Sequence, residues 1–77
     1  MDRHYLISCS EEDLSRALLP IDDQMNNEGV PLRLRAVKGW HLFIAAQQME
    51  LDLHEPASNR VIQWFRARTQ MRQGTKP

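Results

Sequence analysis

Cysteine is almost missing from this chain of 77 residues, because Cys9 is the only one. A single cysteine excludes a disulfide within the chain and is typical of proteins from a reducing compartment. The three histidines, at positions 4, 41 and 54, show no metal-ligand spacing with one another or with Cys9. We therefore expect no structural disulfide, no metal centre and no cofactor.

Glycines and long apolar runs are also scarce. The three glycines are widely spaced and form no glycine-rich phosphate loop: Gly29, Gly39 and Gly74. The longest unbroken apolar run, residues 42–46, is far too short to cross a membrane, and no apolar segment of a secretory signal is present. The acid pairs at 11–12 and 22–23 suit helix starts and surfaces better than general acid/base chemistry. We expect a non-enzymatic, cytoplasmic protein that does not bind membranes.

The formal net charge of zero conceals two halves of opposite sign. Residues 1–29 carry a net charge of −5, from two bases and seven acids, whereas residues 30–77 carry +5, from eight bases and three acids. This asymmetry indicates a basic surface that meets an anionic partner. The alternative is that the acidic half pairs with the basic half, within one chain or across a homodimer.

Two segments show the composition or the alternation of strands. Residues 4–9 are rich in β-favouring types, and residues 30–36 alternate apolar side chains with Arg33 and Arg35. Pro31 near the start of the second segment suits an edge strand or the first residues of a strand. We therefore predict an α+β fold that is mostly helical and contains a small two-stranded sheet.

The segment between these two predicted strands has the signals of a helix. Ser10 is a good N-cap, and three acids follow it in the first turn, where they suit the helix dipole. Pro20 interrupts the apolar face, so we expect a kinked helix or two short helices that meet at 19–20. Gly29 is the expected C-terminal stop.

Two further helices are expected in the second half. Residues 40–53 are apolar on nearly all sides, which predicts a buried central helix packed on two sides. Residues 57–73 predict an amphipathic basic C-terminal helix, so that 1–73 form a single small globular domain and 74–77 a flexible tail. The expected core residues are Trp40, Ile44, Leu51, Val61 and Phe65.

The basic residues of the C-terminal helix point in different directions. At about 100° per residue, Arg68 and Arg72 lie on the same line as the apolar residues Val61 and Phe65. The back half of this helix is therefore expected either to leave the body of the protein or to meet acids such as those of the first helix, and Arg68 is the better candidate for an internal ion pair. Arg66 lies on the opposite side and is expected to face water or a partner.

The order V-x-x-W-F-x-x-R, formed by Val61, Trp64, Phe65 and Arg68, resembles the recognition helix of homeodomains. The resemblance implies that the apolar residues pack in the core and that the next face enters the major groove. It implies these base-reading positions: Gln63, Arg66, Ala67 and Gln70. The adenine-reading asparagine of that family falls at Ala67, which lacks the amide for a bidentate contact. A looser helix-turn-helix arrangement of residues 40–73 is compatible with the pattern.

These observations support two functional hypotheses for a small regulatory protein. In the first, the basic C-terminal half binds nucleic acid, DNA in particular, through seven residues: Arg33, Arg35, Lys38, Arg60, Gln63, Arg66 and Gln70. In the second, the chain is a protein-binding modulator, an inhibitor or adaptor of a larger protein, acting through six charged residues: Glu12, Asp13, Asp23, Arg33, Arg35 and Arg66. A homodimer is compatible with either, since a chain this short is near the lower limit for a self-sufficient core.

Overall fold

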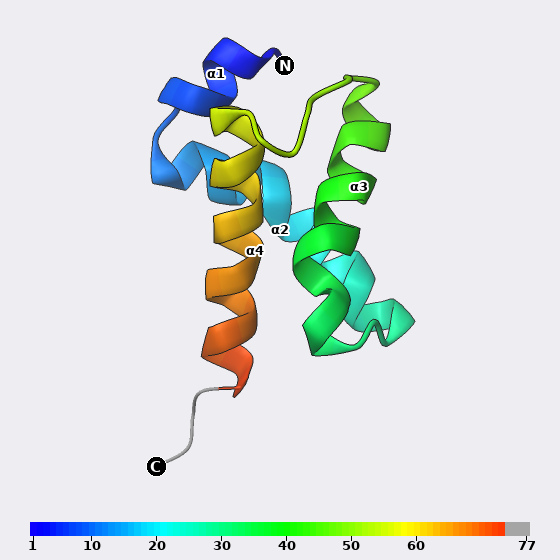
Figure 1. Cartoon of the computed structure of the whole chain (residues 1–77). Helices are drawn as coiled ribbons and strands as arrows, with labels where there is room; N and C mark the ends of the chain where they lie inside the picture. The colour runs from blue at the N-terminus through cyan, green and yellow to red at the C-terminus, as the bar shows by residue number, and fades with distance from the viewer. Residues whose placement is uncertain (74–77) are drawn as a thin grey trace.

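The computed structural model describes residues 1–73, and this part of the chain contains helices and no strand (Figure 1). In chain order the elements are α1 (Arg3–Ser8), α2 (Glu11–Glu28), the 3₁₀ helix η1 (Leu32–Leu34), α3 (Arg35–Gln47) and α4 (Pro56–Gln73). The helices α3 and α4 lie side by side, α2 passes behind them, and α1 lies beside the start of α4. The predicted α+β fold is therefore wrong. The predicted tail at 74–77 lies outside the described residues.

Residues 4–9 belong mainly to α1 and not to a strand. The carboxylate of Asp2 accepts a hydrogen bond from the backbone N–H of Tyr5, at 2.9 Å, and so caps the N-terminus of the helix. The helix buries only Leu6 in the core, while Tyr5 and Ile7 stay exposed. The strand prediction fails because this N-cap and one buried anchor favour a helix, and no second strand is present in the described chain to pair with it.

Residues 30–36 also form no strand. Pro31, with φ of −57°, leads into η1, and α3 follows directly. The side chains do not alternate between core and solvent, since the apolar Leu34 is exposed, whereas Arg35 is buried and donates from Nε to the carbonyl of Val30 at 3.0 Å. The alternation of apolar and basic residues was therefore a coincidence of a helix start, where proline with its fixed φ is well suited.

The helix α2 begins and ends as the sequence predicts. Ser10 Oγ accepts a hydrogen bond from the N–H of Asp13 at 3.1 Å, and Gly29 ends the helix in the left-handed region, with φ of 70°. The helix continues through Pro20 as one element, so the alternative of two short helices is wrong. Proline has no N–H to donate to the carbonyl of Arg16, but both residues are exposed, so water can satisfy this carbonyl.

The helix α3 differs from the predicted central helix at 40–53. It spans Arg35–Gln47 and stops where Gln48 adopts a left-handed conformation, with φ of 55°. One side of α3, which includes Trp40 and Phe43, faces the core, and the other side is exposed. The prediction of a helix buried on two sides is therefore wrong, whereas the predicted C-terminal helix is confirmed as α4.

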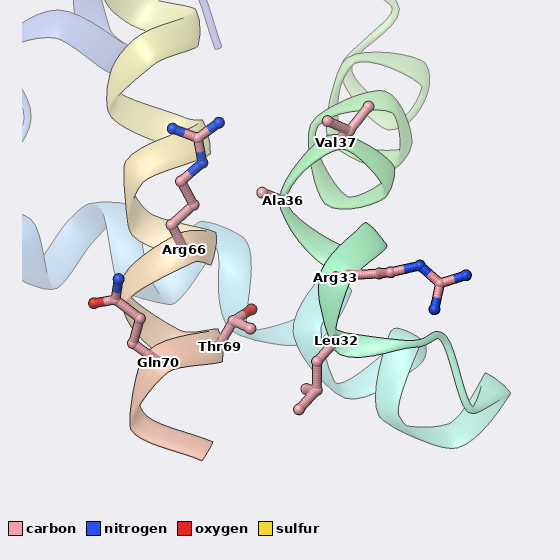
Figure 2. Close-up of a pocket in the computed structure, with 7 residues that line it drawn as sticks. All are labelled: Leu32, Arg33, Ala36, Val37, Arg66, Thr69 and Gln70. Atoms are coloured by element: carbon pink, nitrogen blue, oxygen red, sulfur yellow. The ribbon is translucent and has the colours of Figure 1, made fainter. Parts of the chain in front are cut away.

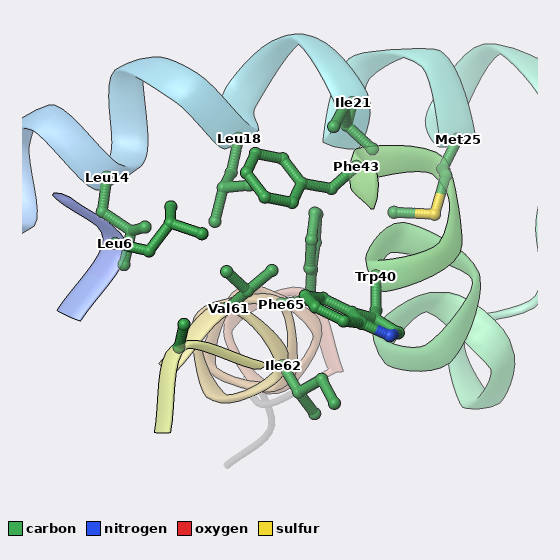
Figure 3. Packing of buried hydrophobic residues seen from close by; sticks show 11 residues of the cluster. Leu6, Leu14, Leu18, Ile21, Met25, Trp40, Phe43, Val61, Ile62 and Phe65 are labelled. Atoms are coloured by element: carbon green, nitrogen blue, oxygen red, sulfur yellow. The ribbon is translucent and has the colours of Figure 1, made fainter. Parts of the chain in front are cut away.

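The core gathers side chains from all four α-helices (Figure 3). Its buried members are Leu6, Leu14, Leu18, Ile21, Met25, Trp40, Phe43, Ala57, Val61, Ile62 and Phe65. Three of the five predicted core residues are buried, namely Trp40, Val61 and Phe65. Ile44 and Leu51 are half-buried and pack against the edge of the cluster. Burying each large apolar side chain stabilises the fold by about 1.5–3 kcal/mol, so this shared cluster fixes α4 against α2 and α3.

Candidate nucleic-acid interface

Neither η1, α3 nor α4 contains an aspartate or a glutamate. The three acids of the basic half all lie in the connector between α3 and α4, at positions 50, 52 and 55. Since α3 and α4 pack side by side, their common surface carries positive charge wherever an arginine or lysine is not paired with another element. We call the exposed surface of η1, α3 and α4 the acid-free face.

A groove of about 270 Å³ lies on the acid-free face between α3 and α4 (Figure 2). Its lining residues are Leu32, Arg33, Ala36, Val37, Arg66, Thr69 and Gln70. The groove therefore brings together three of the seven residues predicted to bind nucleic acid: Arg33 from η1, and Arg66 and Gln70 from α4. Its apolar lining comes mainly from η1 and α3.

The two groove arginines, Arg33 and Arg66, do not converge on one point. In Figure 2 the guanidinium of Arg33 points away from α4, and that of Arg66 extends along α4. Neither side chain makes an ion pair with any residue in the described range 1–73. Both are exposed, so both remain available for a partner.

Two other predicted site residues have internal roles instead. Arg60 Nη1 donates to the carbonyl oxygens of Leu6 and Ile7, at 2.9 and 3.3 Å, and Nη2 reaches Glu11 Oε1 at 3.1 Å. Arg60 thus satisfies the C-terminal carbonyls of α1 and links α4 to the start of α2.

Arg35 fixes the turn between α2 and α3. Its side chain is only 7% exposed and donates to the carbonyl of Val30 and to the side-chain oxygen of Asn26. A buried guanidinium held in this way is not available to a partner. Lys38, by contrast, is exposed on α3, although it does not line the groove.

The predicted internal ion pair of Arg68 is confirmed. Arg68 Nη2 and Arg72 Nη2 lie 3.3 and 2.9 Å from Asp22 Oδ2 on α2, and Asp22 is only 2% exposed. The guanidinium of Arg68 also stacks on Trp64, 5.5 Å from the ring centroid. These contacts hold the last turns of α4 against α2.

The role of Asp22 was missed at the level of sequence, where the Asp22-Asp23 pair was interpreted as surface charge. A signal for it existed, because Asp22 lies four residues after Leu18 and three before Met25, and both are core residues. A carboxylate on an apolar helical face requires a partner of opposite charge. The two arginines on the core line of the last helix are that partner.

The four positions that the homeodomain resemblance implies are all exposed on α4: Gln63, Arg66, Ala67 and Gln70. The helix therefore presents a polar outer surface beside the groove. The connector at 48–55 is longer than the turn of about three to four residues in a helix-turn-helix. The pair α3 and α4 thus offers an exposed helix without that short turn.

The acidic residues of the alternative hypothesis lie on α2. Glu12 and Asp13 are both close to Arg16, with N···O distances of 3.7 and 2.8 Å. Asp23 is exposed and has no ion pair among the residues that the structure describes. The acidic surface is therefore partly neutralised by its own arginine.

Comparison of the chain with models of protein families, with curated proteins and with solved structures finds no match. Within the described range, no helix has both the length and the apolar character that a membrane crossing requires. The same residues contain no group of three or more His, Cys, Asp or Glu side chains positioned to hold a metal ion. The functional argument therefore depends on the acid-free face itself.

Proposed function

We propose that this protein is a small non-enzymatic regulator that binds nucleic acid through the acid-free face. The observation that carries the proposal is that Arg33, Lys38 and Arg66 lie exposed on three neighbouring elements without an acid on any of them. The phosphates of nucleic acid suit such a surface, because each phosphate that an arginine or lysine neutralises releases condensed counterions. Gln63 and Gln70 add exposed hydrogen-bonding groups beside these cations.

Contacts within the chain account for the other arginines but not for these cations. Five arginines form ion pairs: Arg3, Arg16, Arg60, Arg68 and Arg72. Arg35 is buried and bonded to uncharged oxygens. The remaining arginines and lysine of the described chain, Arg33, Lys38 and Arg66, therefore lie on the three elements that carry no acid, whereas random surface charge would leave both signs mixed there.

The test is a salt titration of binding to a short labelled DNA duplex, followed by fluorescence anisotropy. The parent protein should bind at low salt, and the logarithm of its affinity should fall linearly with the logarithm of the salt concentration. Arg66→Ala should lower the slope by about one unit without changing the melting temperature, because Arg66 is exposed and unpaired within 1–73. Arg68→Ala should instead lower the melting temperature.

Arg16→Ala is the matched control. It removes the same charge from an exposed position, but from α2, where Arg16 lies beside Glu12 and Asp13. The control should leave the salt slope unchanged. An equal effect of Arg16→Ala and Arg66→Ala would show that only net charge matters, and absence of binding at low salt would refute the proposal.

A second candidate function, a protein-binding modulator, is favoured by apolar side chains on the same surface. Leu34 and Val37 are 48% and 47% exposed, and Val37 lines the groove. Exposed apolar groups beside unpaired arginines are typical of protein interfaces. Affinity capture with and without nuclease separates the two functions. A stoichiometric complex with one protein that survives nuclease, and that is lost in Val37→Lys, would support the hypothesis of a protein-binding modulator.

A further inference from the structure

We infer that the nucleic acid is bound as a single strand, and that one of its bases occupies a hollow at the C-terminal end of α3, stacked on the ring of His41. This inference depends on the proposed function and specifies its partner. The hollow lies outside the groove between α3 and α4. Its lining, its place beside the exposed cations and the acid at its rim carry the inference.

The hollow has the composition of a ligand site. It measures about 390 Å³ and is lined by residues of α3 and of the connector that follows: His41, Ile44, Ala45, Gln48, Met49 and Glu50. Ligand sites are usually hollows of about 300–1,000 Å³ with a mainly apolar lining and a few polar groups. Here an imidazole, an amide and a carboxylate stand beside three apolar side chains. A planar base with polar edges suits such a lining.

His41 provides the ring on which a base can stack. Single-stranded nucleic acid is recognised by stacking of its splayed bases on aromatic side chains, histidine among them. The imidazole of His41 is exposed on α3. Three other rings of α3 and α4 are buried in the core: Trp40, Phe43 and Phe65. Trp64 is half-buried, and Arg68 lies over its ring. Within the described part of the acid-free face, His41 is therefore the ring that a base can reach.

The hollow continues an exposed row of side chains that starts at the groove. Val37 lines the groove, and His41 and Ala45 follow it at intervals of four residues, so the three lie in one row along α3. Each interval is about 6 Å along the helix axis. Two exposed cations without an ion pair in the range 1–73 stand near this row: Arg33 of η1 and Lys38 of α3. A strand whose phosphates contact these cations can place a base at His41.

A base enters the hollow only when it is separated from its neighbours in the stack. In a duplex this requires flipping the nucleotide out of the helix, which costs the free energy of unstacking and unpairing. In a single strand the bases are already available. The protein should therefore prefer a single strand, although its cations also attract the phosphates of a duplex.

The acid at the rim indicates the kind of base. Glu50 is exposed, lines the hollow and forms no ion pair with the residues that the structure describes. An ionised carboxylate accepts hydrogen bonds and donates none, so it suits a base with an amino group, such as the N4 amino group of cytosine. Thymine has the O4 acceptor instead. We therefore expect cytosine to bind more tightly than thymine.

The first experiment compares competitors of a labelled oligo-dC strand by fluorescence anisotropy, at matched salt and matched phosphate concentration. Unlabelled oligo-dC should displace the label better than a duplex does, and better than oligo-dT of the same length. Equal or better displacement by the duplex would overturn this inference and leave the proposed function standing. Equal displacement by oligo-dC and oligo-dT would overturn the contact with Glu50. No binding of any nucleic acid would refute both the inference and the proposed function.

The second experiment tests whether the ring of His41 is what binds the base. His41→Ala should weaken the binding of oligo-dC about fivefold or more, as the loss of one stacked base does, and should keep the melting temperature because His41 is exposed. His41→Tyr retains a ring and should keep the affinity. His4→Ala, which changes an exposed histidine of α1, is the matched control and should have no effect. Equal losses in His41→Ala and His41→Tyr would show that no base stacks there.

The third experiment tests the carboxylate at the rim. Glu50→Gln keeps the shape of the side chain but removes its charge, so the preference for oligo-dC over oligo-dT should become smaller. Asp23→Asn removes the same charge from an exposed position on α2 and should leave the preference unchanged. A preference that is the same in the parent and in Glu50→Gln would exclude Glu50 from the contact with the base.

Discussion

Gly39 of α3 lacks a side chain at a point where the ring of Phe65 occupies the space. A Cβ atom built at Gly39 would lie 2.8 Å from Cε2 and Cζ of that ring. Replacing a glycine by alanine inside a helix normally stabilises it by about 1 kcal/mol, but overpacking costs about 1–3 kcal/mol. We therefore predict that Gly39→Ala destabilises the protein, measured by denaturant unfolding, and a gain in stability would contradict the observed contact of α3 with α4.

A second glycine gives the control for this prediction. At Gly29 nothing lies within 4 Å of a built Cβ, and its φ of 70° is the source of strain for any other residue. Gly29→Ala should cost about 1–2 kcal/mol. When Phe65→Leu is combined with Gly39→Ala, the loss in the free energy of unfolding caused by Gly39→Ala should become smaller, since the ring edge is removed. The loss caused by Gly29→Ala should not become smaller in the corresponding combination.

Phe65 is also the best single test of how α4 is attached. Its side chain is 1% exposed and its ring packs at 5.1 Å and 89° against that of Trp64. Phe65→Ala should cost about 3–5 kcal/mol, a large share of the stability of a domain this small. Urea unfolding followed by circular dichroism measures the loss. If this variant unfolds at the same urea concentration as the parent, α4 is not held by its apolar side.

At the scale of the elements, Asp22 is the polar link between α2 and the end of α4. Asp22→Asn removes the charge that Arg68 and Arg72 share and should cost about 1–3 kcal/mol. Hydrogen exchange should also become faster in the last turns of α4 than in α3, because the lost contact joins α4 to α2 and does not involve α3. The control is Asp23→Asn, which changes an exposed neighbour without an ion pair in the described chain and should have no effect. Equal effects of the two variants would show that the link contributes nothing.

The short helix α1 should respond to acid. The hydrogen bond from the N–H of Tyr5 holds the pKa of Asp2 below its ordinary value of 3.8. A depressed pKa means that this cap stabilises α1 above pH 3.8, and that the contribution is lost as the pH falls through the lower pKa of the folded state.

The acid response of α1 can be measured by NMR from the amide of Tyr5. Its signal should move towards unfolded values in acid before the signals of α2 and α3 do. In Asp2→Ala the helix should be frayed already at neutral pH. Two results together would show that Asp2 does not cap α1. In the parent protein all helices would be lost at the same pH, and in Asp2→Ala α1 would be intact at neutral pH.

At the scale of the whole molecule, local signals predicted α2 and α4 well, the central helix only in part and the supposed strands badly. The caps at Ser10 and Gly29 and the helix α4 follow from residue types next to them in the chain. Residues 4–9 and 30–36 are too short for periodicity to separate a strand from a helix start. A strand also requires a partner strand, and that is a property of the whole fold.

The candidate site could be predicted from the sequence only in part. Charge counting locates the basic half, and helical geometry separates the outward Arg66 from the inward Arg68, as the ion pair with Asp22 confirms. Counting does not show that Arg35 and Arg60 are bonded to backbone carbonyls, because those contacts join distant or turn-forming segments. The groove itself arises only when η1 and α3 pack beside α4.

The most direct test of the central claim, that the acid-free face binds nucleic acid, is an NMR titration of the labelled protein with a DNA duplex at low salt. The amide signals that shift should belong to η1, to the exposed side of α3 and to the exposed side of α4 around Arg66. The signals of α1 and of the acidic first turn of α2 should stay in place. Shifts concentrated on α1 and α2, or no shifts at all, would contradict the account.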